Sequence, residues 1–301
     1  MIVLRHPVRA LAITVLATAV VVAGLFSAWL AGVHVPGASG ATYLRVAKVE
    51  PLAGADRAGG APTEPFFVLL VGNDYRAGVE GKRGDALHVV GVNPQTKQAS
   101  MLDIPRDTCW RGDKINAANT RGPRASAAAV GDLLGGVPIS YVVEVDFDGF
   151  IALVDGVGGV DVNVPTRMHD SYSGADFAAG PAHMTGDDAL RFSRDRHDFP
   201  TGDIKRTENQ GLLILEAMRQ LQAQMQSATG EFKLLALLGR HAELDGVGLN
   251  DLYRLGRVAY SLDATQIDNI TIPVAGGSCM GLGAGAAGLF ADFRDDGVVS
   301  G

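Results

Sequence analysis

Arginine and aspartate stand together at three places in the first half of the chain, each beside a short apolar run. The groupings are Asp74 with Arg76 after "FFVLLVGN", Arg83 with Asp85 before "ALHVVGV", and Arg106 with Asp107 after "SMLDIP". The guanidinium fork of arginine binds phosphate oxygens in pairs, and aspartate carboxylates hold the Mg²⁺ ions that bridge phosphates. These residue types in this pattern favour phosphate chemistry assisted by a divalent metal.

A second charged block, "RFSRDRHDFPTGDIKRTENQ" at residues 191–210, mixes arginines with aspartates. It holds Arg191, Arg194, Arg196 and Arg206 among Asp195, Asp198 and Asp203. Carboxylates among arginines would repel a phosphate unless they hold a divalent metal or orient the guanidiniums. A solvated loop of surface ion pairs is an equally open alternative. The sequence has no P-loop, no G-x-S-x-G elbow and no H-E-x-x-H motif, which excludes those nucleotide, hydrolase and zinc-protease signatures.

Apolar runs predict the strands that would position these groups. Residues 66–71, 86–93 and 98–104 are typical of strands, the last two forming a hairpin through "NPQTKQ". Pro105 ends the third strand because proline cannot donate to a sheet ladder. If the first and third strands run side by side in parallel, their carboxyl ends share the rim at which open α/β sheets bind ligands. Arg106 would then reach a ligand from that rim, while Asp107 would either hold a guanidinium or cap a turn.

The rest of the pattern alternates between strands and helices. Further strands are predicted at 140–147, 160–165 and 267–273, with a short one at 42–49, and helices at 125–136, 147–159, 205–226, 231–243 and 249–262. Alternating elements combined with a hairpin predict an α/β fold, in which a mixed central β-sheet is sandwiched between helices.

The N-terminal segment predicts a membrane anchor. Arg5, His6 and Arg9 precede an apolar run at 10–33, which as a helix is long enough to cross a hydrocarbon core of ~30 Å. The basic residues favour a cytoplasmic tail at 1–9 and place the rest of the chain outside. The alternative is a cleaved signal peptide, with small residues near Gly40. We expect a single-pass protein of the cell membrane, with one N-terminal transmembrane helix, a stem at 34–64 and an extracytoplasmic domain at 65–301.

The net charge bears on the class of binding partner, and the two cysteines bear on a possible disulfide. The formal net charge of -7 gives no broad basic surface, so we expect no nucleic-acid partner. Cys109 and Cys279 each follow a predicted strand end and would meet at one edge of the sheet. An oxidising exterior permits a disulfide between them, and two unpaired thiols are the alternative.

Taken in order, the motifs resemble those of a known family. "LLVGNDYR", "RGDAL", "IPRDT", "KINAA", "DGVGGVDVNVP", "MTGDDALRFSRDR" and "GDIKRTENQ" are similar to motifs of the LytR-CpsA-Psr (LCP) family, from about residue 66 to residue 218. The resemblance implies an α-β-α fold and a phosphotransferase on the outer face of the membrane. Such enzymes move a glycan phosphate from a polyprenyl-pyrophosphate carrier to peptidoglycan. Two other functions stay open: hydrolysis of the same lipid pyrophosphate, and non-catalytic binding of anionic wall polymer by a membrane-anchored domain.

The resemblance also implies roles for individual residues. It assigns Asp74 and Asp85 to a Mg²⁺ or Mn²⁺ ion. It assigns the pyrophosphate to a larger set: Arg76 or Arg83, Arg106, Arg194, Arg196, Arg206 and Gln210. Arg106, Arg194 and Asp203 are the catalytic candidates, and either Asp203 or Asp85 would serve as general base.

Two further features of the sequence bear on the substrate: residues that depart from the family pattern, and apolar segments that could contact a lipid tail. Gly84 stands where Ser or Ala is commoner, and Cys109-Trp110 is unusual, which leaves the donor glycan open. The lipid tail needs an apolar slot, for which the apolar faces of "GLLILEAM" at 211–218 and "FKLLALLGR" at 232–240 are the candidates.

Overall fold

The computed structural model describes residues 44–50, 62–74, 84–225 and 242–300. All of them belong to one compact unit, Thr42–Gly301. The anchor predicted at 10–33 lies outside the described residues. Within the described ranges, no helix combines the length and the apolar character needed to cross a membrane.

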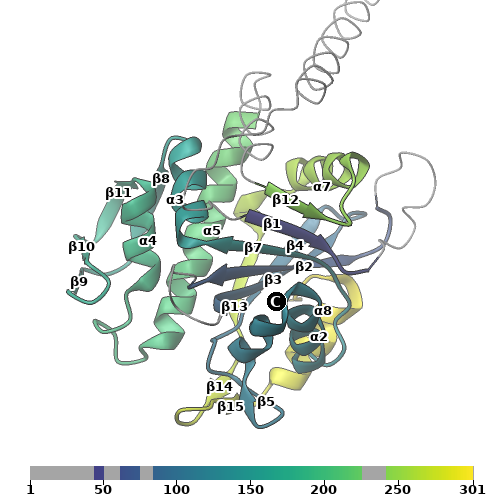
Figure 1. The fold of residues 1–301 in the computed structure, drawn as a ribbon, viewed down its shortest axis with the longest axis horizontal. Helices are drawn as coiled ribbons and strands as arrows, with labels where there is room; N and C mark the ends of the chain where they lie inside the picture. Colours follow the sequence, from purple (N-terminus) through teal and green to yellow (C-terminus); the bar gives the residue numbers. More distant parts are fainter. Residues whose placement is uncertain (1–43, 51–61, 75–83, 226–241, 301) are drawn as a thin grey trace, which may run out of the picture. The chain divides into compact units, whose positions relative to one another are not determined.

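A mixed sheet forms the centre of the part of the chain that the structure describes (Figure 1). Within the described residues the sheet has seven strands. In spatial order they are β12 (Ala242–Asp245), β1 (Leu44–Lys48), β7 (Ile139–Asp146), β2 (Phe66–Asn73), β3 (Gly84–Asn93), β4 (Gln98–Asp103) and β13 (Asp268–Thr271). β2 runs parallel to β7 and β4 runs parallel to β13, whereas β3 is antiparallel to both of its neighbours. The carboxyl ends of β7, β2, β4 and β13 therefore share one rim with the amino end of β3.

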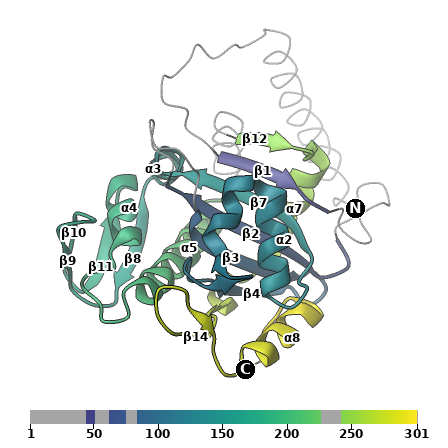
Figure 2. The same ribbon diagram turned by 60° about the horizontal axis from the view of Figure 1, so that its bottom comes forward.

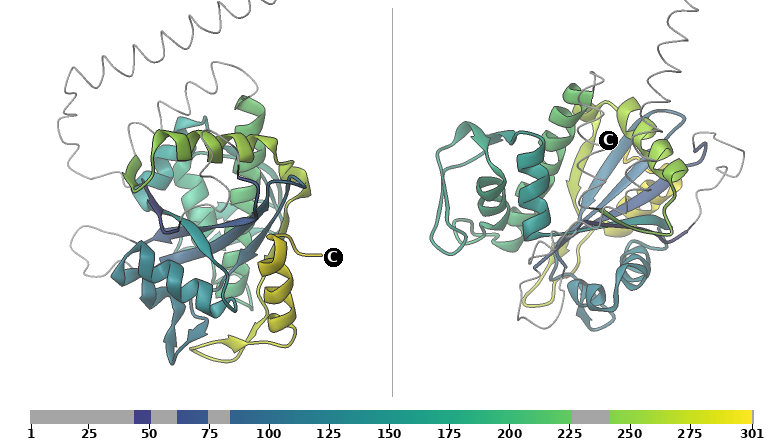
Figure 3. Two further views of the ribbon diagram at one scale, coloured as in Figure 1. Left: turned by 90° about the vertical axis from the view of Figure 1, so that its right-hand side faces the viewer. Right: turned by 45° about the horizontal axis from the view of Figure 1, so that its top comes forward.

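Helices cover both faces of this sheet (Figures 2 and 3). α2 (Pro123–Leu133) and α8 (Ala286–Asp296) pack on one face, and α5 (Asp203–Met225) and α7 (Leu249–Ser261) pack on the other. Phe67 and Leu69 of β2 join the first apolar cluster, while Val68 between them packs against the second. A strand buried on both faces is expected to be a continuous apolar run, as "FFVLLV" is. The predicted mixed sheet between helices is confirmed.

A smaller group of elements, which we call the lobe, lies beside α5 (Figure 1). The lobe consists of α3 (Phe147–Gly156), β8 (Val160–Val164), β9 (Met168–Asp170), β10 (Ala175–Phe177), β11 (Gly180–Met184) and α4 (Gly186–Arg194). β8 pairs with β11, and β9 pairs with β10. A third apolar cluster, which includes Met184 and Phe192, packs the lobe against Leu213 of α5. This packing fixes α4 beside the start of α5.

Short elements complete the described structure. They are β5 (Cys109–Trp110) with β6 (Asp113–Lys114), the 3₁₀ helices η1 (Ile115–Arg121) and η2 (Ala264–Gln266), and β14 (Val274–Ala275) with β15 (Gly281–Leu282).

The structure corrects several predictions. β1 lies between β12 and β7, so residues 44–48 belong to the sheet and not to a stem, and the boundary predicted at residue 65 is too late. β2 and β4, the first and third predicted strands, point the same way but are separated by β3. The helix predicted at 231–243 ends in residues that form β12, and its remainder lies outside the described residues. Helices α4 and α8 were not predicted.

Candidate functional site

Polar side chains from separate elements line one cavity of about 620 Å³ at the rim of the sheet. Asp74 follows β2, Asp85 is the second residue of β3, and Arg106 stands just beyond the end of β4. Arg194 of α4 and Arg206 of α5 line the same cavity. The two charged blocks of the sequence therefore meet at one place.

Arg106 is the centre of an ion-pair network. Its Nη1 donates to the carboxylate of Asp85, and its Nε lies 3.5 Å from Oδ1 of Asp203 and 3.9 Å from Oδ1 of Asp107. Burial lowers the pKa of Arg106, but the three carboxylates outweigh burial and hold the pKa above its usual value. The guanidinium is therefore a permanent cation with a fixed orientation in the wall of the cavity.

The loop after Arg106 is fastened to the C-terminal part of the chain. Asp107 has its nearest cationic partner in Lys114, with Oδ2 2.9 Å from Nζ. The amide of Met280 donates to the carbonyl of Asp107 over 2.9 Å, and the amide of Cys109 donates to the carbonyl of Met280 over 2.7 Å. Cys109 and Cys279 form a disulfide, with their Cα atoms 5.1 Å apart. These links hold the backbone that carries Arg106. The sequence left a disulfide or two unpaired thiols open, and the structure has the disulfide.

The first two turns of α5 present three of the candidate residues. Asp203, Arg206 and Gln210 are spaced by three and four positions and so share one helix face. The carboxylate of Asp203 pairs with Arg206 and also approaches Arg106, so that one anion joins two guanidiniums. Burial lowers the pKa of Arg206; Asp203 opposes this effect and Arg106 adds to it, so the net direction is down. Nε2 of Gln210 donates to the carbonyl of Ser193 over 2.9 Å, which ties α5 to α4.

Two further arginines reach the cavity from the lobe. The guanidinium of Arg194, at the end of α4, lies 5.1 Å from the ring centre of Phe147, a cation–π arrangement. Arg196 follows in an exposed loop, and both arginines line the cavity. Four of the expected phosphate-binding arginines are thus brought together, whereas Arg76 and Arg83 lie outside the described residues.

The other walls of the cavity are apolar. They are formed by Leu70, Val143, Val145, Phe150, Leu153, Leu190, Leu213 and Ile214. Leu213 and Ile214 belong to "GLLILEAM", one of the two segments expected to contact a lipid tail; the other, at 232–240, lies outside the described residues. Apolar walls beside clustered arginines suit an amphipathic ligand with an anionic head.

Sequence reasoning missed a buried polar pair, of which one member, His88, lines the same cavity. His88 of β3 and Asp103 of β4 stand opposite each other, with Nδ1 of His88 2.6 Å from Oδ1 of Asp103 and both side chains buried. α5 passes this pair at Gly211, where a Cβ would lie 2.4 Å from Oδ2 of Asp103 and 2.4 Å from Nδ2 of Asn269. The pair could have been predicted from the hairpin, because the pairing of Asn93 with Gln98 sets residue 88 opposite residue 103.

Asp74 and Asp85 offer the hard oxygen ligands that Mg²⁺ or Mn²⁺ prefers, beside arginines suited to phosphate. Among the described residues, no group of three or more His, Cys, Asp or Glu is arranged to hold a metal ion. Asp74 and Asp85 are the residues of the cavity wall that could hold such a cation, with phosphate oxygens and water completing its shell.

Asp195 lies between Arg194 and Arg196 and has an unusual environment. Its side chain is fully buried. Burial, followed by the nearby Asp198 carboxylate, raises the pKa of Asp195 to about 6. The folded protein therefore favours the protonated form of this group over a pH range in which the unfolded chain ionises it.

We expect Asp195→Asn to gain stability relative to the wild type as the pH rises. The unfolded carboxyl ionises near 3.8 and the folded one near 6, so the wild-type free energy of unfolding falls between these values. Asparagine does not ionise, so the variant escapes this loss, which is on the order of 2 kcal/mol at ~1.4 kcal/mol per pKa unit. Urea unfolding of both proteins at pH 4 and pH 7.5 measures the change. A stability difference that is the same at both pH values contradicts the prediction.

Comparison with known proteins gives consistent matches. The model of the LytR_cpsA_psr family matches residues 36–286. The polyisoprenyl-teichoic acid–peptidoglycan teichoic acid transferase TagU of Bacillus mycoides (strain KBAB4) is 39% identical over 163 residues, which cover 52% of this chain and 53% of that protein. This chain therefore spans about half the length of that curated relative.

Solved structures show the same fold. A LytR-Csp2A-Psr enzyme from Actinomyces oris superposes with a TM-score of 0.66 at 22% identity, covering 78% of this chain and 92% of that one. TagT bound to LIIa-WTA superposes with a TM-score of 0.60 at 22% identity, covering 78% of this chain and 92% of that one.

Proposed function

Because this chain belongs to the LytR_cpsA_psr family, we propose that it transfers a glycan phosphate from a polyprenyl-pyrophosphate carrier to peptidoglycan. One observation carries the proposal: a single cavity combines four arginines and four aspartates, Asp74 and Asp85 among them, with walls of leucine, valine and phenylalanine. A polyprenyl pyrophosphate has the same two parts, an anionic head and a long apolar tail. The similarity to a protein named teichoic acid transferase and to a structure named as bound to LIIa-WTA supports this substrate class.

The arginines would bind the pyrophosphate and offset charge as the reaction proceeds. Arg106 and Arg206 are held by Asp203, so their guanidiniums are already oriented when the donor binds. A hydroxyl group of the peptidoglycan sugar attacks the phosphorus next to the donor glycan, and polyprenyl phosphate leaves. Negative charge grows on the bridging oxygen of the leaving group, and fixed cations at that point lower the barrier.

The contacts of the two candidates for the general base favour one of them. Asp203 is enclosed between two guanidiniums, which makes it a positioning residue for them. Asp85 lines the cavity, although its carboxylate accepts from Arg106. Asp85 is therefore better placed than Asp203 to accept a proton from an attacking hydroxyl.

A divalent cation would bind at Asp74 and Asp85. Mg²⁺ or Mn²⁺ there supplies positive charge to the phosphate oxygens. We expect Asp74→Asn to lower turnover about 10- to 100-fold, the range seen when groups that tune metal affinity are changed. The variant should also need more Mg²⁺ for half-maximal rate, which a titration of transfer rate against Mg²⁺ measures. A wild type that is fully active in excess chelator rules this metal site out.

We further propose that the domain acts outside the cell. The predicted anchor at 10–33 would hold it at the membrane, next to a lipid-linked donor and within reach of peptidoglycan. The disulfide between Cys109 and Cys279 supports an oxidising compartment.

Reconstitution tests the proposed reaction against its alternatives. The full chain is supplied with a polyprenyl-pyrophosphate-linked sugar and peptidoglycan, and the products are identified by mass spectrometry. Sugar phosphate linked to peptidoglycan supports transfer. Release of free sugar phosphate with peptidoglycan present indicates a hydrolase, and binding without turnover indicates a non-catalytic binder.

A further inference from the structure

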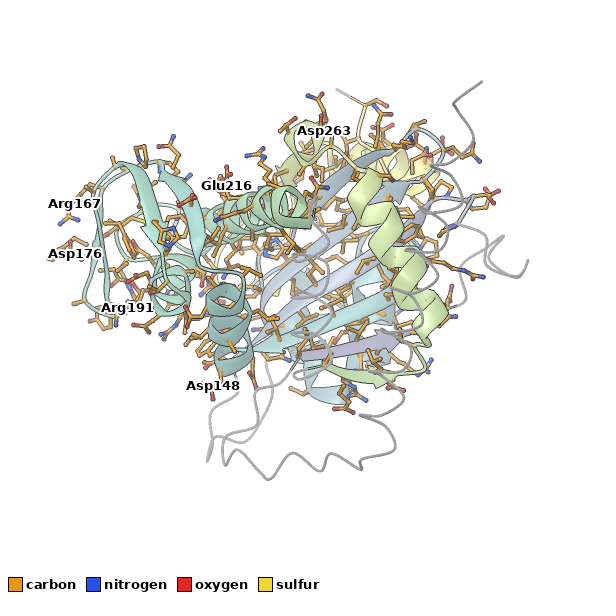
Figure 4. All side chains as sticks on the ribbon, turned by 90° about the horizontal axis from the view of Figure 1, so that it is seen from above. Asp148, Arg167, Asp176, Arg191, Glu216 and Asp263 are labelled. Carbon is orange, nitrogen blue, oxygen red and sulfur yellow. A yellow bond between two sulfur atoms is a disulfide. The ribbon has the colours of Figure 1, made fainter. Side chains whose placement is uncertain are left out.

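Tyr172 is an exposed aromatic residue at the cavity that no role above accounts for. It lies in the turn between β9 and β10, and 79% of its surface is exposed, more than for any other large hydrophobic side chain that the structure describes. Tyr172 nevertheless lines the same cavity as Arg194 and Arg196. The hairpin that carries it belongs to the lobe, whose outer surface Figure 4 marks by Arg167 and Asp176.

The Tyr172 ring is held in place by two neighbours. It stacks on the imidazole of His197, with ring centres 4.4 Å apart and planes inclined by 36°. The buried carboxylate of Asp170 anchors both: it accepts from the Tyr172 amide over 2.8 Å and pairs with Nδ1 of His197 at 3.0 Å. Burial alone would raise the pKa of Asp170, but these hydrogen bonds lower it to about 2, so the anchor stays ionised at neutral pH.

His197 lies against the tyrosine ring, and most of the Tyr172 side chain stays exposed where it lines the cavity. We infer that Tyr172, supported by His197, is a platform that binds a pyranose ring next to the phosphate-binding arginines. The inference rests on the proposed function and adds a carbohydrate subsite to it. A sugar ring from the donor glycan and a sugar ring of peptidoglycan share the chemistry that this platform recognises.

A sugar fits this place better than a lipid chain does. A pyranose presents C–H groups on its faces and hydroxyl groups at its edge, so it can cover an aromatic face while its edge stays in water. A prenyl chain on Tyr172 would remain largely exposed, whereas Leu153, Leu213 and Ile214 offer it enclosed apolar walls in the same cavity. Pre-orientation of the ring by His197 and Asp170 reduces the entropy lost when a ligand binds.

Binding by the full chain in detergent tests the platform. The probes are a polyprenyl pyrophosphate bearing N-acetylglucosamine, the same polyprenyl pyrophosphate without sugar, and the free N-acetylglucosamine–N-acetylmuramic acid disaccharide. The variants are Tyr172→Ala, Tyr172→Phe, which keeps the ring, and Asp176→Ala, a surface control on the same hairpin. We expect Tyr172→Ala to weaken binding of a sugar-bearing probe roughly 3- to 10-fold, with sugar-free pyrophosphate unchanged and both other variants near wild type.

Each outcome decides the inference. A loss confined to the lipid-linked sugar places the donor ring on Tyr172, and a loss confined to the disaccharide places the peptidoglycan ring there. Equal affinity of Tyr172→Ala and wild type for both sugars overturns the platform. An equal loss for sugar-free pyrophosphate also overturns it, because the change then acts through the arginines. A wild type that binds no polyprenyl pyrophosphate refutes the proposed function and, with it, the sugar-binding role of Tyr172.

Discussion

Arg106→Ala is expected to lower kcat/KM for glycan-phosphate transfer by about 10³-fold while the protein remains folded. Phosphoryl transfer depends on fixed positive charge at the transferred group, and a single well-placed arginine contributes ~10³–10⁵ in other phosphoryl-transfer enzymes. Arg106 suits this role because Asp85 and Asp203 orient it and it lines the cavity. Turnover with a lipid-linked donor and peptidoglycan measures the effect.

Two matched variants separate charge from orientation. Arg106→Lys keeps the positive charge but not the planar fork, so we expect partial activity between that of Arg106→Ala and wild type. Arg111→Ala removes an arginine that is 70% exposed and pairs with Asp132 away from the cavity, so its activity should equal that of wild type. Thermal melting of all three shows that they are folded. Full turnover by a folded Arg106→Ala protein would refute the assignment of Arg106.

The position of Arg106 could be predicted because it depends on local rules. Pro105 ends the strand, and the residue after it must lie at the rim of any sheet that contains the strand. The pairing of Arg106 with Asp85 also follows from the predicted hairpin, because the register that sets residue 88 opposite residue 103 brings residue 85 near residue 106. The approach of Arg106 to Asp203 depended on a long-range feature, the packing of α5 against the sheet. A hairpin pattern shows that two strands pair, but not which helix packs at their end.

Other elements around the site could not be placed from the sequence, because the segments that form them are short and have no clear hydrophobic period. β1 was predicted as a short strand at 42–49 but within a stem rich in Gly, Ala and Pro, and only its place between β12 and β7 shows that it belongs to the sheet. The turn that carries Tyr172 joins two strands of three residues each, too short for a period to be recognised. Tyr172 and His197 are far apart in sequence, and their stacking follows from the packing of the lobe.

Replacing both cysteines, Cys109→Ser with Cys279→Ser, is expected to reduce the free energy of unfolding by about 4–5 kcal/mol. The bridge joins residues 170 positions apart, so it removes a large part of the conformational freedom of the unfolded chain in the chain-entropy model. A loss of this size is a large fraction of the ~5–15 kcal/mol that stabilises a typical folded protein. Urea unfolding of oxidised wild type and of the double variant measures it.

The same bridge also bears on activity, because the amide of Cys109 and the carbonyl of Asp107 both bond to Met280. We expect these backbone hydrogen bonds to form without the disulfide as well, so Arg106 should stay near its place and turnover should fall less than it does in Arg106→Ala. Wild type in reductant is the matched control, and it should unfold at the same urea concentration as the double variant. Thiol labelling of unreduced, denatured wild type should find no reactive cysteine. Two labelled thiols, or a double variant as stable as oxidised wild type, would contradict the stabilising bridge.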